Sequence, residues 1–223
     1  NEAMSRDLNL GPDDEVLDVG CGYGALARFL AEQYGCRVLA TNISEKELEW
    51  GRELTREAGM EDRVAFQWAD FHDLPFADSR FSVYWSQEAF LHGADKRRVL
   101  EAAYRVLKPG GQLVFSELLV REGTPDADRS RIYERVGAPE MWDDPDYAAA
   151  LKDIGFTITR HADWSENVAL SYGWVRKELE RRREEFEARV GREVVDATSA
   201  ALQFWVDQAN AGRIGWVYYV AEK

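Results

Sequence analysis

The residues best placed to do chemistry follow an apolar segment near the start of the chain. Residues 15–19 read Glu-Val-Leu-Asp-Val, and Gly20, Gly22 and Gly24 follow before a helical pattern begins. Glycine has no Cβ, so these positions let the backbone turn sharply and approach a ligand. The first N–H groups of the helix would point back at that ligand. The spacing G-x-G-x-G lacks the ending of the dinucleotide fingerprint, so the ligand need not carry a pyrophosphate; a generic tight turn is the alternative.

Further polar and aromatic residues follow later apolar segments. Ligands of open parallel sheets bind beyond the carboxyl ends of the strands, so we expect these residues around one site. Asp70 could accept a hydrogen bond from an exocyclic adenine amine, with a loop or N-cap role as the alternative. Phe71 could lie beside the base or simply pack in the core. The candidates for binding a nucleoside with an amino-acid tail are Asp18, Gly20, Cys21, Gly22, Asn42, Ile43, Asp70, Phe71 and Ser86.

The elements that must position these residues alternate between short apolar runs and amphipathic segments. Strands are predicted over 15–19, 37–41, 64–68, 81–85 and 112–119. Helices are predicted over 23–34, 44–58 and 95–107, with a turn over 108–111. Strands alternating with helices of this length indicate parallel pairing through right-handed crossovers. Ser44 and Asp95 have the side chains expected of N-caps, and Glu47 forms a capping-box pattern with Ser44.

The pattern changes after residue 120. We expect a loop and short-helix insert over 121–146, followed by a helix, a strand, two helices and a last strand over 147–154, 156–162, 165–188, 193–210 and 214–220. The predicted fold is α/β and Rossmann-like. It is a seven-stranded, mostly parallel sheet with helices on both faces and an antiparallel last strand. We expect a single domain over residues 1–223, with its core at about 14–119 and a substrate-side insert and helical tail at about 120–213.

Composition narrows the classes of partner. The chain has 28 basic and 41 acidic residues and a net charge of −13, which argues against nucleic acid or an anionic membrane as partner. It contains no apolar run of membrane-spanning length and no visible secretory signal. Two cysteines without C-x-x-C spacing and three scattered histidines indicate neither a disulfide framework nor a metal site. We therefore expect a cytoplasmic protein, either a monomer or a homodimer.

Four segments, in order along the chain, resemble the motifs of class I S-adenosylmethionine (SAM)-dependent methyltransferases. They are residues 15–24, 69–76, 85–92 and 105–111. A narrower resemblance is to the sarcosine/dimethylglycine N-methyltransferases, which form the osmoprotectant glycine betaine. It rests on residues 41–44 and 85–92 and on the tail around Tyr172, 177–179, 204–206 and 211–216. The resemblance implies SAM as cofactor, S-adenosylhomocysteine as product, no metal, and in-line methyl transfer to the small amines sarcosine, dimethylglycine or both.

Two features depart from the family pattern. Most class I enzymes have an acid after the second strand that holds both ribose hydroxyls, whereas this chain has Asn42. An amide can bond a hydroxyl but lacks the charge and paired acceptors of a carboxylate. The betaine-forming relatives resemble this chain at that position. Family members also carry a longer N-terminal segment over the active site, whereas the first strand is expected here at Glu15, so lid closure is in question.

Three residues after the fourth strand are candidates for the catalytic step. An amine acceptor must arrive unprotonated, and Glu88 or His92 could take its proton directly or through water. The alternatives are a hydrogen-bonding role for Glu88 and a structural role for His92. Gln87 could orient the substrate or the methionine tail of the cofactor.

Residues of the insert and tail are candidates for the acceptor. A carboxylate suits an arginine, and a methylated ammonium suits aromatic faces. The residues chosen on this basis are Arg135, Trp142, Tyr172, Trp174 and Trp216. Two alternatives remain: a different methyl acceptor such as a natural product, and a SAM-binding protein without activity. A nicotinamide-dependent dehydrogenase is disfavoured by the glycine spacing and by Asn42.

Overall fold

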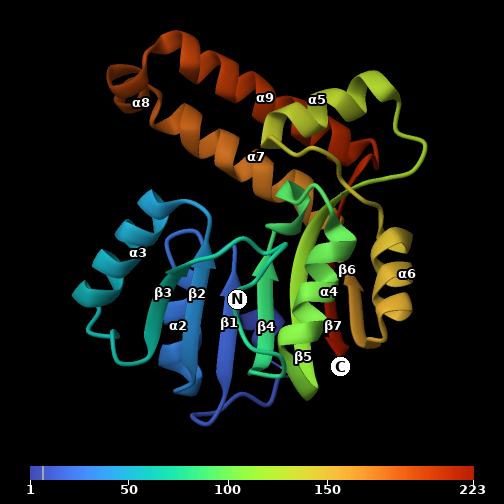
Figure 1. Ribbon diagram of the computed structural model, residues 1–223. Helices are drawn as coiled ribbons and strands as arrows, with labels where there is room; N and C mark the ends of the chain where they lie inside the picture. The colour runs from blue at the N-terminus through green and yellow to red at the C-terminus, as the bar shows by residue number, and fades with distance from the viewer. Residues whose placement is uncertain (7) are drawn as a thin grey trace. The chain divides into compact units, whose positions relative to one another are not determined.

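The computed structural model describes residues 1–6 and 8–223, which form two compact units (Figure 1). Unit 1 comprises Asn1–Glu117, Tyr147–His161 and Tyr218–Lys223, and unit 2 comprises Leu118–Asp146 and Ala162–Val217. The strands are β1 (Glu15–Val19), β2 (Arg37–Asn42), β3 (Val64–Trp68), β4 (Phe81–Gln87), β5 (Leu107–Val120), β6 (Thr157–Asp163) and β7 (Ile214–Glu222). The helices are α1 (Glu2–Ser5), α2 (Ala25–Tyr34), α3 (Glu45–Glu57), the 3-10 turn η1 (Phe90–His92), α4 (Lys96–Val106), α5 (Asp126–Val136), α6 (Asp144–Ile154), α7 (Glu166–Arg181), α8 (Arg183–Val190) and α9 (Arg192–Asn210).

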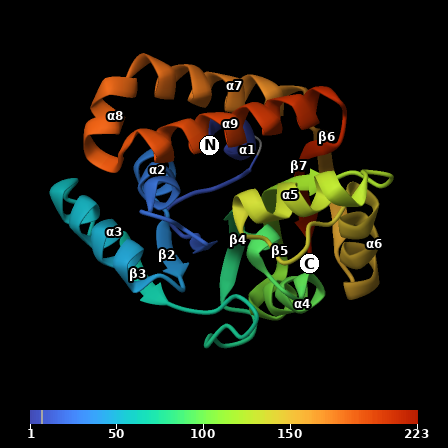
Figure 2. The same ribbon diagram turned by 90° about the horizontal axis from the view of Figure 1, so that it is seen from above.

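The predicted seven-stranded sheet is confirmed. Its strand order is β3-β2-β1-β4-β5-β7-β6, and β1 to β5 pair in parallel. The last strands are antiparallel, and α2 and α4 cover opposite faces of the sheet (Figure 2). The central strands β1 and β4 are almost continuously buried, as expected when both faces of a parallel sheet are covered. Strand order reverses between β1 and β4, so the carboxyl ends of these strands form the switch point where ligands bind.

Both predicted N-caps are present in unit 1. The Ser44 hydroxyl accepts a hydrogen bond from the N–H of Glu47 at 3.3 Å, and the Asp95 carboxylate accepts one from the N–H of Arg98 at 3.0 Å. Each cap satisfies an N–H group that the first helical turn leaves unpaired. These caps fix the start of α3 after β2 and the start of α4 after the β4 loop.

The predicted turn over residues 108–111 is wrong, because these residues belong to β5. The pairing shifts from Phe81↔Leu107 to Val83↔Gln112, so β5 carries extra residues there. The N–H of Gly110 donates to the carbonyl of Lys223 at 2.9 Å, and the N–H of Lys223 donates to the carbonyl of Gly111 at 3.0 Å. The end of the chain therefore supplies the partners that keep this segment in the sheet.

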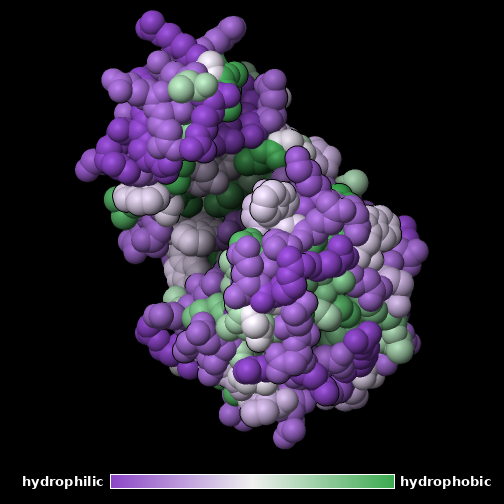
Figure 3. All heavy atoms as spheres, turned by 90° about the vertical axis from the view of Figure 1, so that its left-hand side faces the viewer, coloured by the Kyte–Doolittle hydropathy of each residue, from purple (hydrophilic) through white to green (hydrophobic). Residues whose placement is uncertain are grey.

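The predicted single helix over 165–188 is also wrong, because it is divided at Arg182 into α7 and α8. Beyond the break, Arg183 lies 2.7 Å from Asp196 of α9 and also pairs with Glu180 of α7. The break thus lets α8 pack against α9, and α7 and α9 lie side by side within unit 2 (Figures 1 and 2). The charged side chains of α8 make this end of unit 2 hydrophilic (Figure 3). None of the helices in residues 1–6 and 8–223 is long and apolar enough to cross a membrane.

Candidate active site

The glycine loop follows β1 in unit 1. Gly20, Gly22 and Gly24 have φ values of 72°, 51° and 73°, in the left-handed region that favours glycine. A Cβ on Gly20 would lie 2.4 Å from the Cβ of Ala89, whereas a Cβ on Gly22 would meet no atom within 4 Å. Gly20 therefore permits close backbone packing, and Gly22 leaves open space beside the loop.

The carboxyl group of Asp18 is fully buried beside this loop. Its Oδ2 has no hydrogen-bond partner among the described residues, and burial raises its pKa from 3.8 to about 7. A buried acid without a partner is costly to ionise, and a nearby cation would favour its charged form. The orphaned oxygen therefore fits a ligand that brings a positive charge. Burial, reinforced by Asp18, raises the pKa of the Cys21 thiol, so Cys21 is not a reactive thiolate.

Asn42 is hydrogen-bonded to a carboxylate that the sequence analysis missed. The Asn42 Nδ2 donates to Oε2 of Glu47 at 2.7 Å, and its Oδ1 accepts from the N–H of Ser44 at 3.0 Å. Glu47 was recognised only as part of the capping box. The structure shows that this acid also stands next to the last residue of β2. Ile43, the next candidate, is 64% exposed.

Asp70 and Phe71 follow β3 as predicted from the strand register. The Oδ1 atom of Asp70 accepts from the N–H of His72 at 2.9 Å and lies 2.8 Å from Nδ1 of the same residue. Burial raises the pKa of Asp70, but the bonds from His72 and the charge of Arg98 outweigh it and hold that pKa below its usual value. The Phe71 ring meets the His72 ring edge-on, with centroids 4.8 Å apart. Ser86 is buried, and its hydroxyl donates to the carbonyl of Val19 at 3.2 Å.

Gln87, Glu88 and His92 lie at the end of β4 and in the loop after it. The Gln87 amide lies 3.1 Å from the sulfur of Met4, a buried residue of α1. Glu88 has a φ of 47°, and its Oε1 lies 2.5 Å from the Ser116 hydroxyl. Partial burial, then the Lys96 ammonium, lower the pKa of His92.

The residues before β1 contribute to this region of unit 1. The Tyr218 hydroxyl donates to the carbonyl of Met4 at 2.8 Å, and the Tyr34 hydroxyl donates to the hydroxyl of Ser5 at 2.8 Å. The short helix α1 is thus anchored beside Gln87 by side chains from two separate elements.

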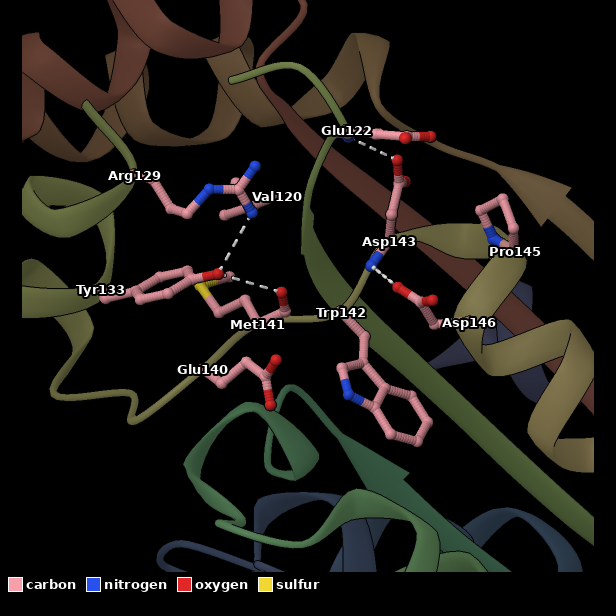
Figure 4. A pocket seen from close by; sticks show the side chains of 10 residues that line it. All are labelled: Val120, Glu122, Arg129, Tyr133, Glu140, Met141, Trp142, Asp143, Pro145 and Asp146. Atoms are coloured by element: carbon pink, nitrogen blue, oxygen red, sulfur yellow. Dashed lines mark hydrogen bonds between the residues drawn. The ribbon is translucent and has the colours of Figure 1, made fainter. Parts of the chain in front are cut away.

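In unit 2, Trp142 lines a pocket of about 340 Å³ with Arg129 and Tyr133 of α5 (Figure 4). Arg129 lies 3.4 Å from the Tyr133 hydroxyl, which donates to the carbonyl of Met141 at 3.2 Å. The pocket also has an acidic lining, formed by Glu122, Glu140, Asp143 and Asp146.

Arg135 does not line the pocket of Trp142. It lines a separate pocket of about 310 Å³ between α5 and α9, together with Arg131 and Phe204. The guanidinium carbon of Arg131 lies 3.8 Å from the centroid of the Phe204 ring. The Nε of Arg135 is buried without a hydrogen bond to the described residues. The structure therefore separates the arginine and the tryptophan that were chosen together from the sequence.

The remaining aromatic candidates have different surroundings within unit 2. Tyr172 packs on the buried Trp205 with ring centroids 4.7 Å apart, and Trp216 meets Trp164 edge-on at 5.3 Å. Trp174 of α7 is 66% exposed. Tyr172 and Trp216 thus serve packing, whereas Trp174 has its ring available to a ligand.

Sheet order, glycine loop and the acid after β3 together define a class I SAM-dependent methyltransferase. The chain matches the Methyltransferase domain family over residues 17–115. It is 37% identical to the sarcosine/dimethylglycine N-methyltransferase of Halorhodospira halochloris, with 97% of this chain and 77% of that protein covered. The chain therefore belongs to the SAM-dependent methyltransferases that include the sarcosine/dimethylglycine N-methyltransferases.

Two solved structures have closely similar folds. The putative sarcosine dimethylglycine methyltransferase of Galdieria sulphuraria superposes with a TM-score of 0.90 at 27% identity, covering 96% of this chain and 79% of that one. The [4+2]-cyclase SpnF superposes with a TM-score of 0.84 at 25% identity, covering 100% of this chain and 78% of that one. The fold is thus shared with a protein named for a different reaction.

Proposed function

We propose that this enzyme methylates the nitrogen of sarcosine, dimethylglycine or both, and that the final product is glycine betaine. The observation that carries the acceptor class is the pocket of unit 2, where one arginine and two aromatic rings stand among carboxylates. A small amino acid with a methylated ammonium has matching groups. The similarity to a sarcosine/dimethylglycine N-methyltransferase along 97% of the chain supports the same acceptors.

The residues of unit 1 fit the three parts of the cofactor. When bound, SAM supplies a methyl group on a positively charged sulfur, so no covalent enzyme intermediate is required. Asp18 offers its unpartnered buried oxygen to the cationic tail. Asn42 and Glu47 offer an amide and a carboxylate to the ribose hydroxyls. Asp70 offers its second oxygen to the adenine amine.

In the acceptor pocket, Arg129 is the arginine that accompanies Trp142, so we assign it, rather than Arg135, to the substrate carboxylate. Tyr133 and Trp142 offer aromatic faces to the methylated nitrogen. The nearby carboxylates favour the positive charge that the nitrogen gains on methylation.

Proton removal from the amine falls to His92. Its lowered pKa keeps the ring neutral near pH 7, so the ring can accept a proton. The Glu88 carboxylate is held at Ser116 and serves to position the loop. Side chains alone supply this chemistry, so we expect no metal requirement, and the two free cysteines support a cytoplasmic location.

Transfer of label from methyl-labelled SAM to glycine, sarcosine and dimethylglycine tests the proposal. We expect turnover with sarcosine or dimethylglycine, unchanged by a chelator such as EDTA, and none with glycine. Absence of turnover with all three acceptors would reject the substrate assignment.

The shared fold of SpnF, which is named for a cyclisation and not for methyl transfer, supports a second candidate, a SAM-binding protein that transfers no methyl group. Calorimetry separates the two functions. Tight SAM binding without label transfer to any amine would favour this second candidate.

A further inference from the structure

His72 connects two loops at the carboxyl edge of the unit 1 sheet. Its Nδ1 lies 2.8 Å from Oδ1 of Asp70 in the loop after β3. On the other side of the ring, Nε2 accepts a hydrogen bond from the N–H of Asp95, the N-cap of α4, at 3.4 Å. A neutral imidazole has one donor and one acceptor, so acceptance at Nε2 places the proton on Nδ1. In this tautomer, His72 donates to Asp70.

Both bonds from His72 reach the same oxygen of Asp70. The backbone N–H of His72 donates to Oδ1 at 2.9 Å, and the ring donates to Oδ1 at 2.8 Å. The other oxygen, Oδ2, has no hydrogen bond to the described residues. Two donors on one oxygen fix the plane of a carboxylate, and the second oxygen is left to accept from a ligand.

The ring of His72 is itself held in place. The edge of Phe71 packs against it, and a Cβ on Gly93 would come within 3.4 Å of Nε2, so a larger residue would crowd the ring. The carbonyl of His72 accepts a hydrogen bond from Nε of Arg98 at 2.8 Å. A ring confined in this way, rather than a mobile one, can orient its neighbour.

We propose that His72 is a positioning residue that turns Oδ2 of Asp70 toward the exocyclic amine of the adenine of SAM. Its role rests on the proposed function, which supplies that adenine. His72 thereby contributes to the choice of adenine over purines without the amine, although it does not touch the reacting atoms.

Two ligands and three variants test this role. The ligands are S-adenosylhomocysteine and its purine analogue that lacks only the 6-amino group. His72→Phe keeps a ring against Phe71 but has no donor, and His72→Asn restores a donor near the position of Nδ1. His161→Phe is the matched control, because it makes the same change in β6 of the same unit. Calorimetry gives the Kd of each pair, and thermal unfolding shows that each variant is folded.

We expect His72→Phe to raise the Kd of S-adenosylhomocysteine about ten-fold, because an Asp70 carboxylate without this bond no longer holds Oδ2 in place to accept from the adenine amine. The Kd of the desamino analogue should stay the same, and His72→Asn should recover most of the loss. Equal weakening of both ligands, or no weakening of either, would overturn the positioning role while leaving the methyltransferase function intact. If the wild-type protein binds neither ligand, the proposed function fails as well.

Discussion

The candidate residues of unit 1 and unit 2 are built in different ways. In unit 1 they lie at the carboxyl ends of four adjacent parallel strands, and the glycine backbone of residues 20–24 shapes the central loop. In unit 2 they are spread over α5, the segment before α6, α7 and the start of β7. Strand topology thus gathers the first group, whereas the second group depends on how individual helices pack.

The difference has a chemical counterpart. Binding a nucleoside requires a sharp turn and a few fixed acceptors, which backbone geometry and local hydrogen bonds supply. Recognition of a small amino acid requires a charge and aromatic faces at the correct spacing, which long side chains supply. We therefore expect changes to the unit 1 backbone to have larger effects on cofactor binding than any single side-chain change in unit 2 has on the acceptor.

Gly20→Ala should have the largest effect. The new Cβ would lie 2.4 Å from the Cβ of Ala89, which is fixed to its own backbone, and the φ of 72° is itself unfavourable for alanine. Because the loop must move, we expect the Kd of S-adenosylhomocysteine to rise about 100-fold, through a conformational cost of about 1–2 kcal/mol and an overpacking cost of about 1–3 kcal/mol. Calorimetry measures this Kd.

Gly59→Ala is the control for this variant. Gly59 has a φ of 65°, but a Cβ there would meet no atom within 4 Å. The Gly59→Ala variant should have a modestly lower unfolding temperature and an unchanged Kd for S-adenosylhomocysteine. A Gly20→Ala protein that binds as tightly as Gly59→Ala would show that backbone geometry does not govern the cofactor site.

The contrast between the units also explains what could be predicted from the sequence. The strands, Ser44, Asp95 and the position of Asp70 follow from local periodicity and capping chemistry, which a short segment determines by itself. The second role of Glu47 was missed because its place in the capping box already explained it. The strand at Gly110 and the break at Arg182 depend on Lys223 and Asp196, which are distant in sequence. Arg129 was passed over for Arg135 because only the packing of α5 shows which arginine lines the pocket of Trp142.

The charge of Asp18 makes cofactor binding depend on pH. Its pKa of about 7 lies above the ordinary 3.8, so the acid is largely protonated in the ligand-free protein at pH 6. A cationic ligand requires the carboxylate, so the proton must leave on binding. We therefore expect the Kd of SAM to fall about ten-fold from pH 6 to pH 8, because the competent fraction rises across the pKa.

The stability of the ligand-free protein should change in the opposite direction. The raised pKa means that the folded protein favours the protonated acid. The contribution of Asp18 to the free energy of unfolding is therefore complete below pH 3.8 and is lost as the pH rises through about 7. Asp18→Asn should remove both trends. A Kd that keeps its full pH dependence in Asp18→Asn would assign the titration to another group.

Two arginines of α5 provide a matched pair in unit 2. We expect Arg129→Met to raise the KM for dimethylglycine about ten-fold, because a charge-assisted bond to the carboxylate is lost, and Arg135→Met to change it by less than about two-fold. The Kd of SAM should be unchanged in both variants. Steady-state kinetics measures both KM values. A larger increase for Arg135→Met than for Arg129→Met would assign the substrate carboxylate to Arg135.

An effect smaller than that of Arg129→Met is expected at Gly215, the unit 2 counterpart of Gly20. A Cβ there would come 2.8 Å from the guanidinium carbon of Arg121. The guanidinium nitrogens of Arg121 lie 3.0 Å from the Asp143 carboxylate and 2.8 Å from that of Asp163. A long flexible side chain can shift where the Cβ of Ala89 cannot, so Gly215→Ala should raise the KM for the acceptor only about three-fold, by loosening the residue next to Trp142. The effect passes through Arg121, so adding Gly215→Ala to Arg121→Met should change the KM no further. Additive effects in this double-mutant cycle would show that Gly215 acts by another route.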